Sequence, residues 1–160
     1  MSRETARPLW FCFVVLSLVA FVLNWFWEMA QMRAYTEMAS APWASTLMTC
    51  TWASIGDVAF TFIIYGIGAL ATGQSRWGMT GRWHVMAAAA ILGAVFATAV
   101  EWNAQVSGRW SYTEAMPMVP MFGVGLWPFL QLTVTVPIAF LVGGWWASIR
   151  SQESKRTPRP

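Results

Sequence analysis

The chain has 160 residues, of which 57% are apolar and only 11% are charged, and its net charge is +3. An average soluble domain carries about 25% charged residues, so this composition argues against a surface that faces water on all sides. Four of the ten basic residues lie in a short C-terminal run, which predicts a solvated tail, or one that lies on anionic lipid, and not a nucleic-acid-binding surface. The length predicts a single domain.

Four long apolar stretches follow one another along the chain, at residues 9–32, 48–72, 83–105 and 121–146. Each exceeds the roughly 20 residues that a helix needs to cross about 30 Å of hydrocarbon. None shows the period-two alternation of a membrane strand, and the first is too long for a signal peptide. The sequence therefore predicts an all-α integral membrane four-helix bundle within residues 1–150, followed by a flexible basic tail at residues 151–160.

Prolines indicate where these helices begin. Pro8 suits the first turn of the first helix, where a missing N–H costs nothing, and Pro117 and Pro120 precede the fourth helix. Pro128 and Pro137 fall inside the predicted fourth helix, and we expect both to kink it.

The distribution of basic residues predicts the orientation of the bundle. Eight of the ten lysines and arginines lie in the N-terminal tail, the second connection and the C-terminal tail, whereas the first and third connections carry only Arg33 and Arg109. By the positive-inside rule, the termini face the cytoplasm. We therefore expect a multi-pass protein of the bacterial inner membrane, with the lipid bilayer as its main partner.

Three carboxyl groups fall within the predicted spans: Glu28, Asp57 and Glu101. A carboxyl group in hydrocarbon is costly, so each is a functional-site hypothesis by default. At 1.5 Å rise per residue, all three fall within roughly 15 Å of the outer surface. We predict that they meet in the outer half of the bundle as catalytic acid and base groups. The alternative is that they face headgroups or water, or only hold helices together by hydrogen bonds.

Polar residues accompany each carboxyl group at helical spacing, which places them on one face. The sets are Asn24, Glu28 and Gln31; Ser54, Asp57 and Thr61; Thr98, Glu101 and Gln105; and Gln131 and Thr135. We expect these four faces to turn toward one another. With the neighbouring aromatic and third-connection residues, they predict a substrate-binding set: Asn24, Trp27, Gln31, Trp102, Gln105, Arg109, Trp110, Tyr112 and Gln131.

The third connection is aromatic and rich in methionine, from Gly108 to Gly123. We expect it either to fold over the outer mouth of the bundle, with Arg109 pairing with a carboxylate, or to form a re-entrant or interfacial segment. As a lid it would exclude water from the site.

No metal ion or cofactor is expected from the sequence. Cys12 and Cys50 have no C-x-x-C spacing and fall in or beside apolar runs, where cysteine is usually a packing residue. The single histidine, His84, begins the third predicted helix on the cytoplasmic side, far from the carboxyl groups.

Two motifs carry a resemblance to known membrane enzymes. The run from Asn24 to Glu28 has the form N-x-x-W-E, which resembles an early helix of fungal membrane-bound terpene cyclases that make meroterpenoids. The run from Glu101 to Tyr112 has a membrane-embedded glutamate followed by G-x-W-x-Y, and is similar to a repeat of membrane lycopene cyclases. The whole pattern also resembles a family of small bacterial integral membrane proteins with four helices, for which it implies the fold alone.

The cyclase resemblance implies acid–base chemistry on an isoprenoid chain. Where those enzymes carry an acidic P-x-E-E pair, this chain has Phe129, Leu130 and Gln131 after Pro128. The cyclases also have six or seven helices, so the resemblance implies either a homodimer or a simpler reaction for a four-helix chain. Asp57 and Glu101 would then be acid and base in unknown order, with Glu28 as a third partner.

Three functions remain open from the sequence. The first is an enzyme that acts on an apolar isoprenoid-like or lipid small molecule. The second is a small proton-coupled transporter that uses the same carboxyl groups as ion sites. The third is a non-catalytic membrane assembly factor, in which the polar stripes only fix helix packing.

Overall fold

A computed structural model describes residues 9–156 of the chain. Its long helices are α1 (Leu9–Gln31), α3 (Trp43–Thr72), α4 (Trp83–Val106) and α5 (Leu126–Arg156). All four are long and apolar enough to span a membrane. This confirms the all-α prediction and supports a multi-pass membrane protein.

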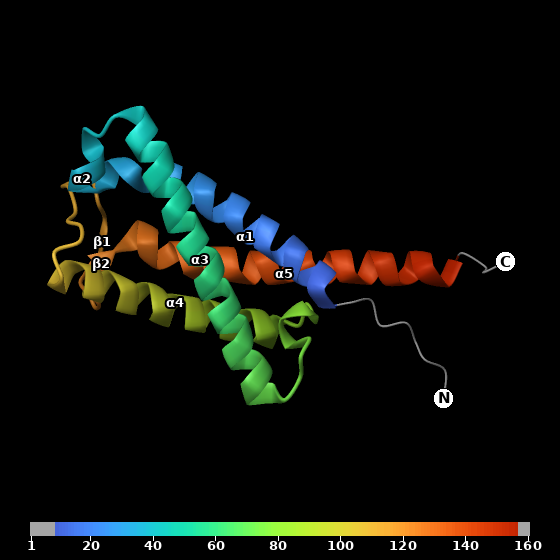
Figure 1. Ribbon diagram of the computed structural model, residues 1–160. Coiled ribbons are helices and arrows are strands. Elements are labelled where there is room, and N and C mark those ends of the chain that lie inside the picture. The colour runs from blue at the N-terminus through green and yellow to red at the C-terminus, as the bar shows by residue number, and fades with distance from the viewer. Residues whose placement is uncertain (1–8, 157–160) are drawn as a thin grey trace.

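Short elements connect the long helices. The 3₁₀ helix η1 (Met32–Ala34) and helix α2 (Thr36–Ala39) follow α1, and the 3₁₀ helix η2 (Trp77–Met79) lies between α3 and α4. Strands β1 (Met118–Val119) and β2 (Val124–Gly125) pair antiparallel before α5. Helix α2 and the β1–β2 hairpin lie together at one end of the molecule, opposite the end at which α1 begins (Figure 1).

Helix α5 is the centre of the bundle. It packs along α1 on one side and along α4 on the other, whereas α3 packs mainly on α1 and crosses the other helices (Figure 1). Toward the end that carries α2, helices α3 and α4 diverge (Figure 1). The aromatic rings of Phe60 on α3 and Phe96 on α4, with centroids 5.9 Å apart, bring these two helices into contact.

The opposite end of the bundle is filled by apolar packing. Trp77 of η2 is buried and donates a hydrogen bond from Nε1 to the Tyr65 carbonyl at 2.6 Å. Its ring packs on Tyr65 and Phe140, and a Cβ atom at Gly68 would overlap it. The connection between α3 and α4 therefore closes this end of the bundle.

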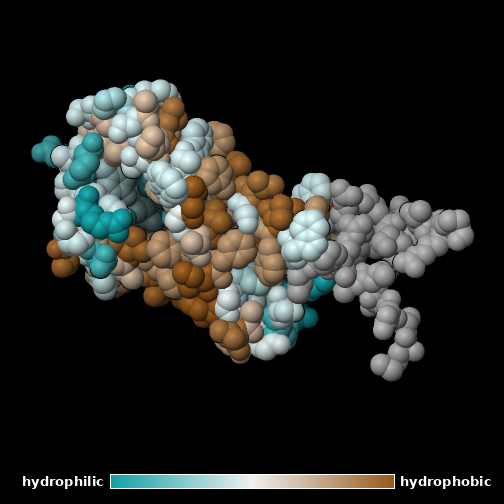
Figure 2. Space-filling model, in the orientation of Figure 1, coloured by the Kyte–Doolittle hydropathy of each residue, from teal (hydrophilic) through white to brown (hydrophobic). Residues whose placement is uncertain are grey.

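Large apolar side chains cover the outside of the helices. Leu18, Phe26, Leu70, Ile91 and Val106 are among those that are more than half exposed, and Figure 2 shows a broad apolar surface along the helices. An apolar surface of this extent is typical of a membrane or partner-binding face. Together with four helices of spanning length, it is compatible with a multi-pass membrane protein.

Two predicted helix limits are wrong at the α2 end. Helix α3 begins at Trp43, five residues before the predicted start, because Pro42 in an extended conformation ends the connection there. Residues 121–125 are not helical but form a turn and strand β2, with Gly123 at a φ of 64°. Pro128 therefore lies in the first turn of α5, where it needs no N–H, and only Pro137 lies in the interior.

The predicted tail begins as helix. Helix α5 continues past the predicted end at residue 146 as far as Arg156. Residues 157–160 of the predicted tail, and Pro8 with the two N-terminal arginines, lie outside the described residues.

Candidate functional site

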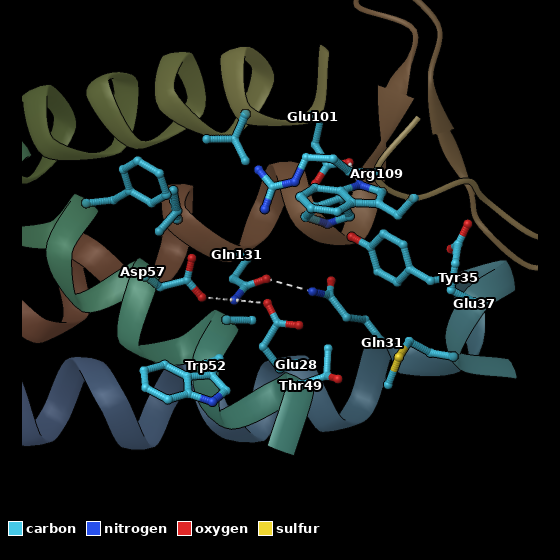
Figure 3. A pocket seen from close by; sticks show the side chains of 18 of the residues that line it. Glu28, Gln31, Tyr35, Glu37, Thr49, Trp52, Asp57, Glu101, Arg109 and Gln131 are labelled. Atoms are coloured by element: carbon cyan, nitrogen blue, oxygen red, sulfur yellow. Dashed lines mark hydrogen bonds between the residues drawn. The ribbon is translucent and has the colours of Figure 1, made fainter. Parts of the chain in front are cut away.

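The side chain of Gln131 joins polar residues from helices α1, α3 and α5. Its Nε2 donates to Asn24 Oδ1 at 3.2 Å, to Glu28 Oε1 at 2.9 Å and to Asp57 Oδ2 at 2.7 Å. Its Oε1 accepts a hydrogen bond from Gln31 Nε2 at 2.7 Å. Figure 3 shows Gln131 between Asp57, Glu28 and Gln31. Glu28 and Asp57 are thus separated by no more than the span of two hydrogen bonds.

The cluster has a buried part, made of amide side chains, and a partly exposed part, made of the two carboxyl groups. Asn24, Gln31 and Gln131 are buried, and the hydroxyl of Thr135, one turn further along α5 than Gln131, donates to Asn24 Oδ1 at 3.1 Å. Glu28 and Asp57 are half-buried. The amides therefore hold the two carboxyl groups at the edge of an accessible space.

Glu101 forms a second polar group on helix α4. It is 4% exposed, and its Oε2 accepts hydrogen bonds from Tyr112 Oη at 2.5 Å and from Trp110 Nε1 at 3.0 Å. Tyr112 Oη in turn accepts from the Gly125 amide at 3.0 Å and from Gln105 Nε2 at 3.2 Å. The third connection thus fixes one oxygen of Glu101.

The first and third connections are clasped together above the cluster. Tyr35 and Tyr112 form an antiparallel β-bridge, and Glu37 accepts hydrogen bonds from the Ser111 amide and hydroxyl, both at 3.0 Å. Slight burial acts to raise the pKa of Glu37, but its own backbone amide and Ser111 donate to the carboxylate and lower the pKa below its usual value. Glu37 is therefore an anionic acceptor in this clasp at neutral pH.

The two tyrosines of the clasp are neutral donors near the carboxyl groups. Burial, followed by the nearby Glu101 and Glu28, raises the pKa of Tyr35 far above its usual value. Burial and the hydrogen bond to Glu101 raise the pKa of Tyr112 in the same direction. Both phenols therefore keep their protons at physiological pH.

All three carboxyl groups line one cavity of about 720 Å³. Its walls come from α1, α3, α4, α5 and both connections, and include the aromatic residues Tyr35, Trp52, Phe60 and Trp110. Figure 2 shows the hollow at the α2 end of the molecule, with hydrophilic residues on one side and the apolar belt on the other. The cavity lies at the end where α3 and α4 diverge, and residues of both helices line it.

The cavity contains part of the predicted site. Of the predicted catalytic and binding residues, those that line it are Glu28, Gln31, Asp57, Glu101, Arg109, Trp110 and Gln131. Asn24 and Tyr112 lie behind these residues and hold Gln131 and Glu101.

Three other predicted binding residues lie outside the cavity wall. Gln105 is exposed and contacts Tyr112. Trp27 and Trp102 donate to the backbone carbonyls of Trp127 and Phe122 at 3.0 and 2.7 Å. These indoles fasten the start of α5 and the preceding turn to α1 and α4.

Apart from Asp57 and Glu101, the residues of the predicted polar stripes on α3 and α4 do not line the cavity. The buried hydroxyls of Ser54, Thr61 and Thr98 donate to the carbonyls four residues earlier, at 2.7, 2.8 and 2.8 Å. A hydroxyl that is satisfied by its own helix can pack in an apolar interior. Polarity alone was therefore a poor guide to the face of α3 that carries Asp57.

Arg109 does not pair with a carboxylate within residues 9–156. Its guanidinium carbon lies 5.0 Å from the centroid of the Trp110 ring, and its side chain is exposed. The aromatic face and water stabilise this cation where it stands. The expected ion pair is thus replaced by a cation–π contact at the rim of the cavity.

Sequence analysis missed several wall residues, chiefly Tyr35, Met48, Trp52 and Phe60. Trp52 and Phe60 lie near Asp57 at helical spacing, with Gly56 between them, so a periodicity that included aromatic residues would have found them. Tyr35 follows the first span directly and carries no comparable signal.

The cavity combines carboxyl groups with aromatic walls. Among the described residues, no three histidine, cysteine or acidic side chains lie close enough together to hold a metal ion. Carboxyl groups that line a cavity are suited to donating and accepting protons.

Comparison with known proteins gave no relative. No protein-family model matches the chain, and no curated protein or solved structure is significantly similar to it. The geometry of the cavity is therefore the main indication of function.

Proposed function

We propose that this protein is a membrane enzyme that performs acid–base chemistry on an apolar, isoprenoid-like or lipid substrate. One observation carries the proposal: Glu28, Asp57 and Glu101, from three different helices, line a single cavity with aromatic walls. Buried carboxyl groups are costly in a membrane protein. Three that converge on one cavity are better explained by chemistry than by packing.

The arrangement suits a proton-initiated isomerisation or cyclisation. A protonated carboxyl group transfers its proton to an alkene or epoxide, which leaves a carbocation on the substrate. The faces of Trp52, Trp110 and Tyr35 stabilise that cation. A second carboxylate then removes a proton from a neighbouring carbon, so the product is an isomer of the substrate and no oxidant or cofactor is consumed.

The pair Glu28 and Asp57 supplies both roles at one place. Their shared hydrogen-bond donor, Gln131, holds the two groups adjacent, and adjacent carboxyl groups can act as one acid and one base. Glu101 keeps one oxygen on Tyr112 and Trp110, and the Tyr35 side chain is a further hydrogen-bond partner of this carboxyl group.

The half of the bundle that is distant from the cavity favours an enzyme over a transporter. A transporter needs a polar path to the opposite face. Between Asn24 and the end of the bundle that carries η2, the core contains apolar residues such as Leu16, Ile64 and Val136. Trp77 is buried at that end and closes it.

Solvent isotope incorporation tests the proposed chemistry. We would incubate the purified full-length protein, in lipid nanodiscs and D₂O, with polyprenyl alcohols and their terminal epoxides, and analyse the products by mass spectrometry. From an alkene we expect the wild type to give an isomeric product with one carbon-bound deuterium. An epoxide is protonated on oxygen, so it should give an isomer without carbon-bound deuterium. Formation of either isomer should fall roughly 100-fold or more in Asp57→Asn and Glu101→Gln. Glu114→Gln, an exposed glutamate outside the cavity wall, is the matched control.

Two outcomes would overturn the proposal. One is the absence of any isomeric product from the defined chains and from the whole lipid extract of the host. The other is equal deuteration by the wild type and by the triple variant that lacks all three carboxyl groups.

A further inference from the structure

Hydrogen-bond acceptors outnumber donors around Gln131. A side-chain amide has two N–H donors, but Gln131 Nε2 lies within hydrogen-bonding distance of three acceptors, on Asn24, Glu28 and Asp57. Thr135 supplies one more donor, to Asn24. Gln31 is a further hydrogen-bond partner of Glu28, but the Glu28 and Asp57 carboxyl groups together still have more lone pairs than these donors can fill.

A buried amide oxygen adds to the shortage. Gln31 lines the cavity and is 5% exposed, and its Oε1 has no hydrogen-bond partner among the described residues. Exchanging its oxygen and nitrogen would not help, because Gln131 turns its own oxygen toward Gln31 in order to donate to the carboxyl groups. A buried unsatisfied acceptor costs about 1–3 kcal/mol, which a donor supplied by a ligand would relieve.

The protein's nearest cation does not fill this role. Arg109 lies at the rim of the cavity on the Trp110 ring and pairs with no carboxyl group within residues 9–156. Its position shows that the face of Trp110 accepts a cation. Trp52 and Tyr35 present further aromatic surface to the same cavity.

The geometry points to a ligand that brings its own positive charge and N–H donors. We propose that the cavity binds a single-chain amphiphile with a protonated amine at its polar end. The amine lies between Glu28, Asp57 and the Gln31 oxygen, and the apolar chain leaves through the opening between α3 and α4 into the bilayer. This inference rests on the proposed function because the protonated amine would occupy the position that the substrate carbocation takes in the proposed reaction. Binding of the amine can nevertheless be measured without any catalytic turnover.

Equilibrium binding of three probes of equal chain length tests the charge preference. The full-length protein in phosphatidylcholine nanodiscs is titrated with radiolabelled dodecylamine, dodecanol or dodecanoate, and empty nanodiscs give the background partition into lipid. We expect dodecylamine to bind at least about tenfold more tightly than the other two. A tenfold difference corresponds to about 1.4 kcal/mol.

Variants separate the cavity from the rest of the surface. Asp57→Asn and Glu28→Gln keep the shape of each side chain and should each weaken amine binding about tenfold. Arg109→Gln removes a like charge from the rim and should strengthen it, a change that misfolding would not produce. Glu114→Gln, which lies outside the cavity wall, should leave it unchanged.

The result separates this inference from the proposed function. Equal binding of amine and alcohol, or an unchanged affinity in both carboxyl variants, overturns the inference even if deuterated products form. Selective amine binding that follows the carboxyl variants supports it even if no isotope is incorporated, in which case only the proposed reaction fails.

Discussion

Gln131 decides how two carboxyl groups can share one wall of the cavity. Its amide donates to Glu28 and Asp57 and receives Gln31 on its other side. A carboxylate at 131 could not donate to two neighbouring carboxylates, so the amide is consistent with acid and base groups that come from α1, α3 and α4.

Replacing Gln131 should therefore destabilise the bundle. Gln131→Leu leaves Asn24, Glu28 and Asp57 without their shared donor, and we expect a loss of roughly 1–3 kcal/mol in the free energy of unfolding. The loss is measured by denaturant titration in detergent micelles, followed by circular dichroism.

Gln105→Leu is the matched control for that substitution. Gln105 is an exposed amide whose hydrogen bond goes to Tyr112, and a surface change of this kind is expected to stay within about 0.5 kcal/mol. Equal losses in the two variants would show that the hydrogen bonds of Gln131 have no special role in the packing of the helices.

At the scale of the elements, hydropathy predicted the four long helices but not their ends. Length and apolar content identify a span because a lipid-facing helix needs both. The start of α3 at Trp43 carries the polar residues Ser45 and Thr46, so its hydropathy is low. The hairpin at 118–125 is apolar like a span and differs only in its proline and glycines, which hydropathy does not register. The clasp between Tyr35 and Tyr112 joins the first and third connections, which are far apart in the chain. The sequence of neither connection indicates that it pairs with the other.

The connection between α3 and α4 closes the far end of the bundle because Gly68 leaves room for Trp77. A Cβ atom at Gly68 would overlap the indole, whereas one at Gly66, on the same helix, meets no atom within 4 Å. We expect Gly68→Ala to cost about 1–3 kcal/mol by overpacking and Gly66→Ala to be nearly neutral.

Thermal unfolding of both variants in detergent measures this difference. Limited proteolysis at residues 73–82 reports whether η2 has left the bundle, and it should increase in Gly68→Ala alone. If the two alanine variants unfold at the same temperature as the wild type, Trp77 is not held in the place that the structure gives it.

At the scale of the whole molecule, the depth of the three carboxyl groups was the most informative sequence signal. It predicted that they share one half of the bundle, and they line one cavity. Which residues form the walls of that cavity depends on how α3 tilts away from α4. This tilt is set by the packing of the helices against one another, which the spacing of residues along one helix does not report. Trp52 and Phe60 could therefore not be assigned to it by polarity.

The side of the membrane on which the cavity opens is the remaining prediction. Basic residues gather in the connection at residues 73–82 and toward both termini, and Arg33 and Arg109 are the two that lie near the cavity. Because basic segments stay in the cytoplasm, we expect the cavity to face the outside.

Labelling with a membrane-impermeant maleimide tests that orientation. In intact cells the reagent should label Glu114→Cys, near the cavity, but should label Gln74→Cys, in the connection at the opposite end, only after permeabilisation. Both native cysteines are buried and should react slowly in either state. The reverse pattern would place the carboxyl groups in the cytoplasmic half, so protons for the proposed reaction would come from the cytoplasm and not from the outer compartment.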